Sequence, residues 1–309
     1  MTLAAAHRAA RSRAAVGLFG QNITAMVTPF RRSGGLDFDA AIALAAHLVD
    51  EGCDGLVLNG TTGEAPVTSD KEKRDLVREV VRAVGARARV TAGIGTNDTR
   101  HSLELAAQAA DAGAHGLLAV TPYYSRPAQE GVVAHFTALA EATELPMMLH
   151  DIPLHTGIAI AADSFARLAE HPRIVAVQDA RGDLLSGSTV MRRTGLAYYC
   201  GEDPLSLPWL SVGATGLIGV AGHVAPRLLH TMIRRFAEGD TTGALDVHQR
   251  LCPLYQLTEE VGGVPFTKAA LAATGRPVGV PRLPHLPATR REHDEIEAVL
   301  AELFAHPQR

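Results

Sequence analysis

The chain has 309 residues, of which 47% are hydrophobic and 20% are charged. This is enough apolar material to bury a large core, so the composition excludes disorder for most of the chain. A net charge of −4 gives no electrostatic reason to expect a nucleic acid or an anionic membrane as a partner. We therefore expect a folded protein with a small-molecule ligand.

The use of cysteine and the hydropathy of the chain indicate its cellular setting. Cys53, Cys200 and Cys252 are widely spaced and form no C-x-x-C pair, which is not the pattern of a disulfide framework or a zinc site. No segment approaches the roughly 18 uninterrupted apolar residues that a membrane span needs. We expect a soluble, cytoplasmic protein with no nucleic-acid partner and no membrane partner.

The N-terminal segment is basic. Its first sixteen residues carry Arg8, Arg11 and Arg13 and no acidic residue, but they lack the continuous apolar region of a secretory signal. An organellar transit peptide and a frayed extension over residues 1–19 both fit this composition. We favour the frayed extension.

From residue 22 onward, short apolar runs alternate with longer amphipathic stretches. The runs are rich in β-branched residues and end at Gly, Asn, Thr or Pro, as strands do. Eight strands are predicted: Ile23–Val27, Gly55–Leu58, Val90–Gly93, Gly116–Val120, Pro146–His150, Ile174–Gln178, Ala197–Cys200 and Gly216–Val220. Apolar residues at i, i+3, i+4 spacing predict helices between them, such as Asp37–Glu51, Asp70–Val84, Thr99–Ala112, Gln129–Ala142 and Ala162–His171.

Eight βα units within residues 20–238 favour a closed (β/α)8 TIM barrel of the α/β class. An open doubly wound sheet would more often have fewer strands and a glycine-rich nucleotide turn, and the chain has no such turn. Three further helices, Thr241–Glu260, Pro265–Ala273 and Thr289–His306, follow in a C-terminal helical region, residues 239–309. We expect this region to be an appendage on the barrel.

The loops at the C-terminal ends of barrel strands carry the active sites of such folds. After the second predicted strand comes Asn59-Gly60-Thr61-Thr62-Gly63-Glu64. Its glycines let the backbone approach a ligand, and its hydroxyl and N–H groups suit a carboxylate. The loops after the fourth, fifth and sixth strands begin with Thr121-Pro122-Tyr123-Tyr124, His150-Asp151 and Gln178-Asp179.

Taken in order, these motifs resemble those of the dihydrodipicolinate synthase and N-acetylneuraminate lyase family of pyruvate-handling (β/α)8 aldolases. The resemblance runs from about Gly20 to the C-terminus, and DGLVLNGTTGEAP and HGLLAVTPYYSRPAQEG are most similar to the actinobacterial synthases. It implies a lyase that assembles as a homotetramer from pairs of tight dimers. It also implies that pyruvate binds as a Schiff base to a lysine at the end of the sixth strand.

The sequence departs from the family pattern at three aligned positions. Gln178 occupies the position of the Schiff-base lysine, and an amide cannot form an iminium because its nitrogen lone pair is delocalised into the carbonyl. His150 aligns with the tyrosine that relays protons, and His155 with the arginine that orients a substrate carboxylate.

The three lysines of the chain do not offer a substitute. Lys71 and Lys73 are expected to be solvated on a helix, and Lys268 to lie in the C-terminal helical region. None follows a predicted strand, so the sequence predicts a site without a Schiff-base lysine.

Other positions of the family pattern are retained. Thr61 and Thr62 align with the pyruvate-binding threonine and the relay threonine, in an order that stays open, and Tyr124 with a tyrosine supplied by the neighbouring subunit. The predicted catalytic residues are His150, Tyr124 and Thr61, and the predicted substrate-binding residues are Thr62, His155, Gln178, Gly60 and Ile218.

Structural roles stay open for several of these residues. The two threonines fit a helix cap, Tyr124 fits an interface aromatic residue, and His150 fits a hydrogen-bonded core histidine. Asp179 is expected to point away from the barrel interior because it follows an inward-facing position.

Three functions fit this pattern. The first is a divergent lyase without a cofactor that acts on a small keto acid or carboxylate, with His150 exchanging protons near its ordinary pKa of about 6.5. The second is an inactive paralogue that senses a ligand or co-assembles with a partner. The third is a metal-dependent aldolase with His150, His155 and Asp151 or Asp179 as ligands. It ranks last because these side chains are not expected to converge, so no metal site is predicted.

Overall fold

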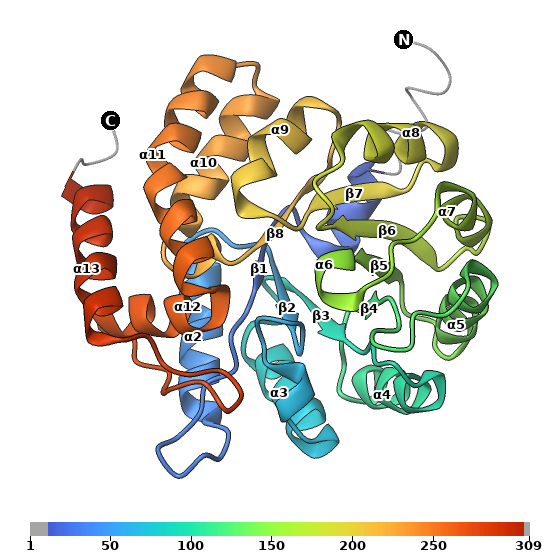
Figure 1. Ribbon diagram of the computed structural model, residues 1–309, viewed down its shortest axis with the longest axis horizontal. Helices are drawn as coiled ribbons and strands as arrows, with labels where there is room; N and C mark the ends of the chain where they lie inside the picture. The colour runs from blue at the N-terminus through green and yellow to red at the C-terminus, as the bar shows by residue number, and fades with distance from the viewer. Residues whose placement is uncertain (1–11, 306–309) are drawn as a thin grey trace.

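A ring of eight parallel strands forms the centre of the molecule (Figure 1). The computed structural model describes residues 12–305. The strands follow one another around the barrel in chain order, and β8 pairs with β1 to close it. They are β1 Asn22–Ala25, β2 Gly55–Leu58, β3 Arg89–Gly93, β4 Gly116–Val120, β5 Met147–Asp151, β6 Ile174–Asp179, β7 Ala197–Cys200 and β8 Gly216–Gly219.

The predicted strands are confirmed, since β2, β4 and β7 have the predicted bounds and the other five differ by one or two residues at one or both ends. The fold is therefore the predicted TIM barrel. Its helices are α2 Phe38–Asp50, α3 Asp70–Val84, α4 Thr99–Asp111, α5 Gln129–Glu141, α6 Pro153–Thr156, α7 Ala162–Leu168, α8 Leu184–Thr194, α9 Ser206–Ser211 and α10 Pro226–Ala237. Short 3₁₀ turns occupy Ala65–Val67, Asp203–Leu205 and Ala221–His223.

Short polar residues begin several of the helices. Asp37, Asp98 and Asp183 accept hydrogen bonds from backbone N–H groups in the first turns of α2, α4 and α8. Ser69 and Glu72 form a reciprocal capping box at the start of α3. These contacts satisfy donors that a helix N-terminus leaves without partners, which explains why sequence located the helices well.

The strands separate two hydrophobic cores. One core lies between the strands and the surrounding helices. The other fills the barrel interior with inward side chains of the strands, because successive residues of a strand point to opposite faces. Its strand members are Ile23, Val57, Leu118, Met148, Ala176, Ala197, Tyr199 and Ile218.

The described part of the N-terminal segment is not frayed, contrary to our expectation. Residues 12–19 are helical, and Phe19 at their end is fully buried in the inner core. A Cβ added at Gly116 would lie 2.6 Å from the Phe19 ring, and one at Gly55 would lie 2.2 Å from the Phe19 carbonyl oxygen. Both glycines are the first residues of their strands, so the Phe19 side chain fills the N-terminal end of the barrel interior. Arg8 and Arg11 lie outside the described residues.

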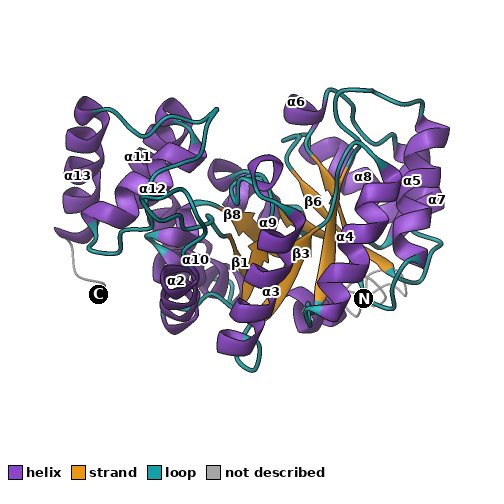
Figure 2. Ribbon diagram, turned by 90° about the horizontal axis from the view of Figure 1, so that it is seen from below, coloured by secondary structure: helices purple, strands orange, loops and turns teal. Residues whose placement is uncertain are grey.

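The C-terminal helical region consists of α11 Thr241–Val261, α12 Gly263–Ala273 and α13 Arg290–Ala305. Figure 2 shows these helices together on one side of the barrel, where α11 packs against α10. Within residues 12–305, no helix is both long and apolar enough to cross a membrane.

Candidate active site

A cavity of about 610 Å³ lies at the C-terminal ends of the strands, and we call it the barrel-mouth cavity. Ala25, Val57, Leu118 and Ile218 line its base, above the inner core. The predicted residues Gly60, Thr61, Thr62, His150, His155 and Gln178 also line it. The structure thus brings together seven of the eight predicted site residues, and the exception is Tyr124.

Residues 60–64 form a turn at the rim of the cavity, which we call the threonine turn. Thr61 is exposed and Thr62 is buried, and both line the cavity. The interpretation of the threonines as helix caps is wrong, because Ser69 caps α3 and Glu64 precedes the 3₁₀ turn. Neither threonine hydroxyl therefore has a helix-capping role.

His150 and Gln178 are paired neighbours on β5 and β6 and are 6% and 5% exposed. His150 Nε2 and Gln178 Oε1 have no hydrogen-bond partner among the described residues. The Gln178 amide nitrogen donates one long hydrogen bond, 3.4 Å, to the Ile218 carbonyl oxygen. Buried polar atoms without partners are costly, and at a cavity wall they indicate a place where a ligand binds.

The protonation of His150 differs from the expectation of an ordinary pKa. Burial lowers the pKa of His150 to about 3, and the nearby His155 lowers it further. The ring is therefore neutral at pH 7, when one nitrogen donates and the other accepts a hydrogen bond. It is a hydrogen-bonding group and a weak base at that pH, not an imidazolium acid.

Tyr124 lies outside the cavity of its own chain. Its side chain is 90% exposed, and its backbone adopts a left-handed conformation with φ of 70°. Leu154, on α6 after β5, is 87% exposed. Tyr123, which precedes Tyr124 in the chain, lines a second cavity of about 380 Å³. This cavity adjoins the first at Thr61 and His150.

The C-terminal helical region supplies part of the cavity wall, which sequence reasoning missed. The cavity is lined here by Tyr255 and Glu259 of α11 and by His285 of the connector between α12 and α13. Glu202 lies after β7, and burial together with the charges of Asp203 and Glu259 raises its pKa to about 7. Glu202 could have been predicted as a cavity residue because it follows a strand, whereas no spacing in the sequence pointed to Tyr255, Glu259 or His285.

The acidic residues proposed as metal ligands face away from the cavity. Asp179 accepts a hydrogen bond from the Arg181 backbone nitrogen, 2.9 Å, which agrees with its expected outward orientation. The Asp151 carboxylate lies 3.6 Å from the Arg181 guanidinium, and burial raises its pKa to about 7. Among residues 12–305, no group of three or more His, Cys, Asp or Glu is placed to hold a metal ion. The ligand set with His150 and His155 does not assemble.

No lysine lies among the described residues that line the barrel-mouth cavity. Lys71 is solvated, as expected, and pairs with Asp75. The expectation for Lys73 is wrong, since it is 8% exposed and donates a hydrogen bond to the Thr68 carbonyl oxygen. Lys268 is 2% exposed and lies 2.7 Å from a Glu64 carboxylate oxygen.

Comparison with known proteins relates this arrangement to one family. Residues 18–303 match the model of the dihydrodipicolinate synthetase family. A relative from Streptomyces coelicolor, 4-hydroxy-tetrahydrodipicolinate synthase 2, is 54% identical over 283 residues, or 92% of this chain and 95% of the relative. A dihydrodipicolinate synthase structure from Bacillus anthracis is 38% identical, covers 93% of this chain and 98% of its own, and has a TM-score of 0.89. An Acinetobacter baumannii synthase in complex with pyruvate is 32% identical, with coverage of 92% and 98% and a TM-score of 0.88.

Proposed function

Because the chain belongs to the dihydrodipicolinate synthetase family, we propose that it is a lyase-type enzyme that acts on a small keto acid without a lysine Schiff base. The observation that carries the proposal is Gln178, which stands at the end of β6 with an unpartnered amide oxygen at the cavity. The pyruvate bound to the Acinetobacter baumannii relative supports the substrate class.

The residues of the cavity have separate roles in this proposal. The threonine turn binds the carboxylate through its hydroxyl and N–H groups. The second N–H of the Gln178 amide and the neutral His150 ring donate hydrogen bonds to the keto oxygen, where negative charge develops as an α-proton passes to water and the enolate forms. A single donor of this kind contributes on the order of 10²–10³ in rate in other enzymes. No cofactor is needed for these steps.

An inactive paralogue that senses a ligand or acts as an assembly partner is the second candidate. The low pKa of His150 favours it, because a base with a pKa of about 3 accepts a proton poorly at pH 7. The two candidates share a carboxylate-binding cavity and differ in turnover.

Borohydride trapping tests the absence of a Schiff base. We expect treatment of the protein with pyruvate and borohydride to leave its intact mass unchanged, because no lysine lines the barrel-mouth cavity. Lys73 lines the adjoining second cavity, where its ammonium is buried and donates to the Thr68 carbonyl oxygen. A stable pyruvyl adduct on Lys71, Lys73 or Lys268 would overturn the proposal.

Thermal shift tests the carboxylate site. We expect pyruvate or a small dicarboxylate to raise the melting temperature, since a ligand that binds only the folded state stabilises it. Thr62→Val should abolish the shift, whereas Thr189→Val, on α8 and away from the cavity, should leave it unchanged. An equal shift in both variants would contradict the assigned role of the threonine turn.

His150→Ala separates the two candidates once a substrate has been found. In the enzyme it should lower the turnover rate by roughly 10²–10³, the contribution of one hydrogen-bond donor to the developing negative charge, and change binding much less. In a sensor there is no turnover to lose, so binding without any reaction of the bound keto acid would favour the second candidate.

We also propose a homotetramer in the cytoplasm, in which a neighbouring subunit's copy of Tyr124 completes each cavity. The exposure of Tyr124 and of Leu154, which lines the cavity, supports this, because exposed large apolar side chains indicate an interface. We expect a tetrameric mass by light scattering at micromolar concentration. A monomeric mass would contradict the shared site.

A further inference from the structure

Glu64, the last residue of the threonine turn, has an unusual backbone and an unusual environment. Its φ of 55° and ψ of 38° lie in the left-handed region, which costs a residue with a side chain free energy unless its surroundings fix it. Its side chain is fully buried. A buried carboxylate needs a charged or hydrogen-bonding partner, and here the partners come from outside the barrel strands.

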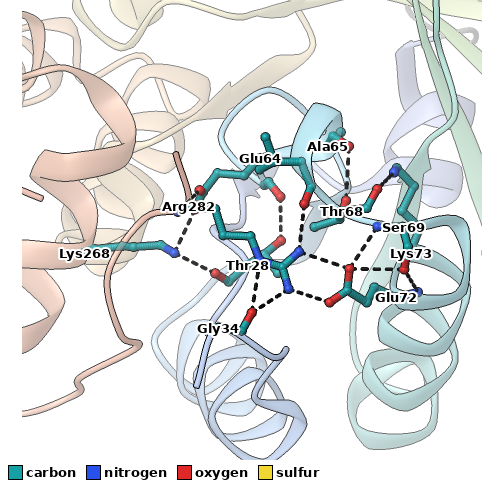
Figure 3. A network of polar contacts seen from close by, with 12 residues as sticks. Thr28, Gly34, Glu64, Ala65, Thr68, Ser69, Glu72, Lys73, Lys268 and Arg282 are labelled. Carbon is teal, nitrogen blue, oxygen red and sulfur yellow. Dashed lines mark hydrogen bonds and ion pairs between the residues drawn. The ribbon is translucent and has the colours of Figure 1, made fainter. Parts of the chain in front are cut away.

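Two cationic residues of the C-terminal helical region hold this carboxylate (Figure 3). Lys268 of α12 forms an ion pair of 2.7 Å with Glu64 Oε1. The backbone nitrogen of Arg282 donates a hydrogen bond of 2.8 Å to Glu64 Oε2. Lys268 therefore contacts one carboxylate oxygen of Glu64, and the Arg282 backbone contacts the other.

Both cationic residues are themselves fixed in place. The Lys268 ammonium donates to the Thr28 carbonyl oxygen, 2.9 Å, and lies 4.2 Å from the centre of the Phe30 ring. The Arg282 guanidinium lies over the same ring at 4.1 Å and donates to Glu72 and to the Val67 carbonyl oxygen. Its hydrogen bonds hold the pKa of Glu72 down at about 2.

The turn is also held from the strand side. The Thr28 hydroxyl donates a hydrogen bond of 2.6 Å to the Gly63 carbonyl oxygen. Because Lys268 contacts the Thr28 carbonyl oxygen, one lysine fixes both the side chain that ends the turn and the residue that holds its backbone. A backbone held from these directions keeps its N–H groups aimed without reorganisation when a ligand binds.

We propose that Lys268 and Arg282 are positioning residues, which fix the threonine turn in its ligand-binding conformation through the carboxylate of Glu64. This rests on the proposed function only in assigning the turn to carboxylate binding. The C-terminal helical region is then part of the site.

Substitutions within this cluster test the proposal. Lys268→Met alone leaves Glu64 as a buried, unpaired charge, which threatens folding, so it is combined with Glu64→Gln. Arg282→Met is the second variant: it keeps the backbone N–H contact to Glu64 but removes the guanidinium that ties this backbone to Glu72 and to the Val67 carbonyl oxygen. Arg282→Lys is its conservative partner. Arg276→Met, an exposed arginine in the same connector, is the matched control.

Amide hydrogen exchange and pyruvate affinity are the two readouts, the second by calorimetry. In the double variant and in Arg282→Met, we expect exchange at the Glu64 and Ala65 amides, which bond to the Thr61 and Gly60 carbonyl oxygens, to accelerate by about tenfold or more while exchange in α4 stays unchanged. The dissociation constant for pyruvate should rise by about tenfold, because misplacement of binding groups weakens their contacts. Arg282→Lys should recover part of both effects, and Arg276→Met should show neither.

Unchanged exchange at the Glu64 and Ala65 amides in the folded variants would overturn the positioning role, and so would an increase of equal size throughout the chain. If the parent protein binds neither pyruvate nor a small dicarboxylate, the proposed function fails. Exchange then decides the positioning role by itself.

Discussion

Phe19→Ala should lower the free energy of unfolding by about 3–5 kcal/mol, as large-to-small substitutions of buried aromatic residues do. Phe19 is fully buried, its ring packs edge-on against Tyr199 at a centroid distance of 6.4 Å, and the Tyr199 hydroxyl donates to the Gly20 carbonyl oxygen. The substitution opens the N-terminal end of the barrel and leaves a cavity against Gly116. The effect falls on stability because the site lies at the opposite end.

Urea unfolding at a fixed protein concentration measures this effect, since an oligomer's apparent stability depends on concentration. Phe304→Ala is the control, because Phe304 of α13 is 51% exposed and its loss should change stability by about 0.5 kcal/mol or less. Equal midpoints for the two variants would show that the segment over residues 12–19 is dispensable.

The barrel could be predicted because its information is local. Each strand is a short apolar run, and each helix begins at a capping residue such as Ser69, so neither needs knowledge of distant contacts. The order and pairing then follow from the rule that consecutive βα units lie side by side. Phe19 could not be placed this way, because its burial depends on barrel closure, which brings Gly55 and Gly116 beside it.

In the candidate site, too, the positions of residues could be predicted from the sequence, whereas properties that depend on tertiary contacts could not. His150 and Gln178 were found because they end predicted strands and align with the tyrosine and lysine positions of the family pattern. The low pKa of His150 could not be predicted, since it follows from burial that only the assembled barrel creates. Lys73 was predicted to be solvated, and Lys268 was given no role. Both outcomes have the same cause: the folded chain brings Lys73 to Thr68 and Lys268 to Glu64, and sequence does not show these contacts.

Gln178→Lys should convert the protein from one that borohydride and pyruvate leave unmodified into one that carries a trapped pyruvyl adduct. The side chain at this position points into the barrel and lines the cavity, so the new amine meets a keto acid bound at the threonine turn. Burial lowers the pKa of an amine and raises the fraction that is neutral and nucleophilic at pH 7. Gln249→Lys, at an exposed position of α11, is the matched control and should give no adduct.

Adduct formation is not turnover, and the single substitution should give little synthesis of 4-hydroxy-tetrahydrodipicolinate. Proton transfer groups contribute roughly 10²–10⁴ in rate, and groups that act as a unit do not recover activity one at a time. His150 is neutral with a pKa of about 3, and His155 lacks the paired N–H donors with which an arginine grips a carboxylate. Adding His150→Tyr and His155→Arg to Gln178→Lys should therefore raise turnover by about 10²-fold or more over the single variant. Full activity from Gln178→Lys alone would instead show that the two histidines are adequate substitutes, and that the site lacks only the lysine.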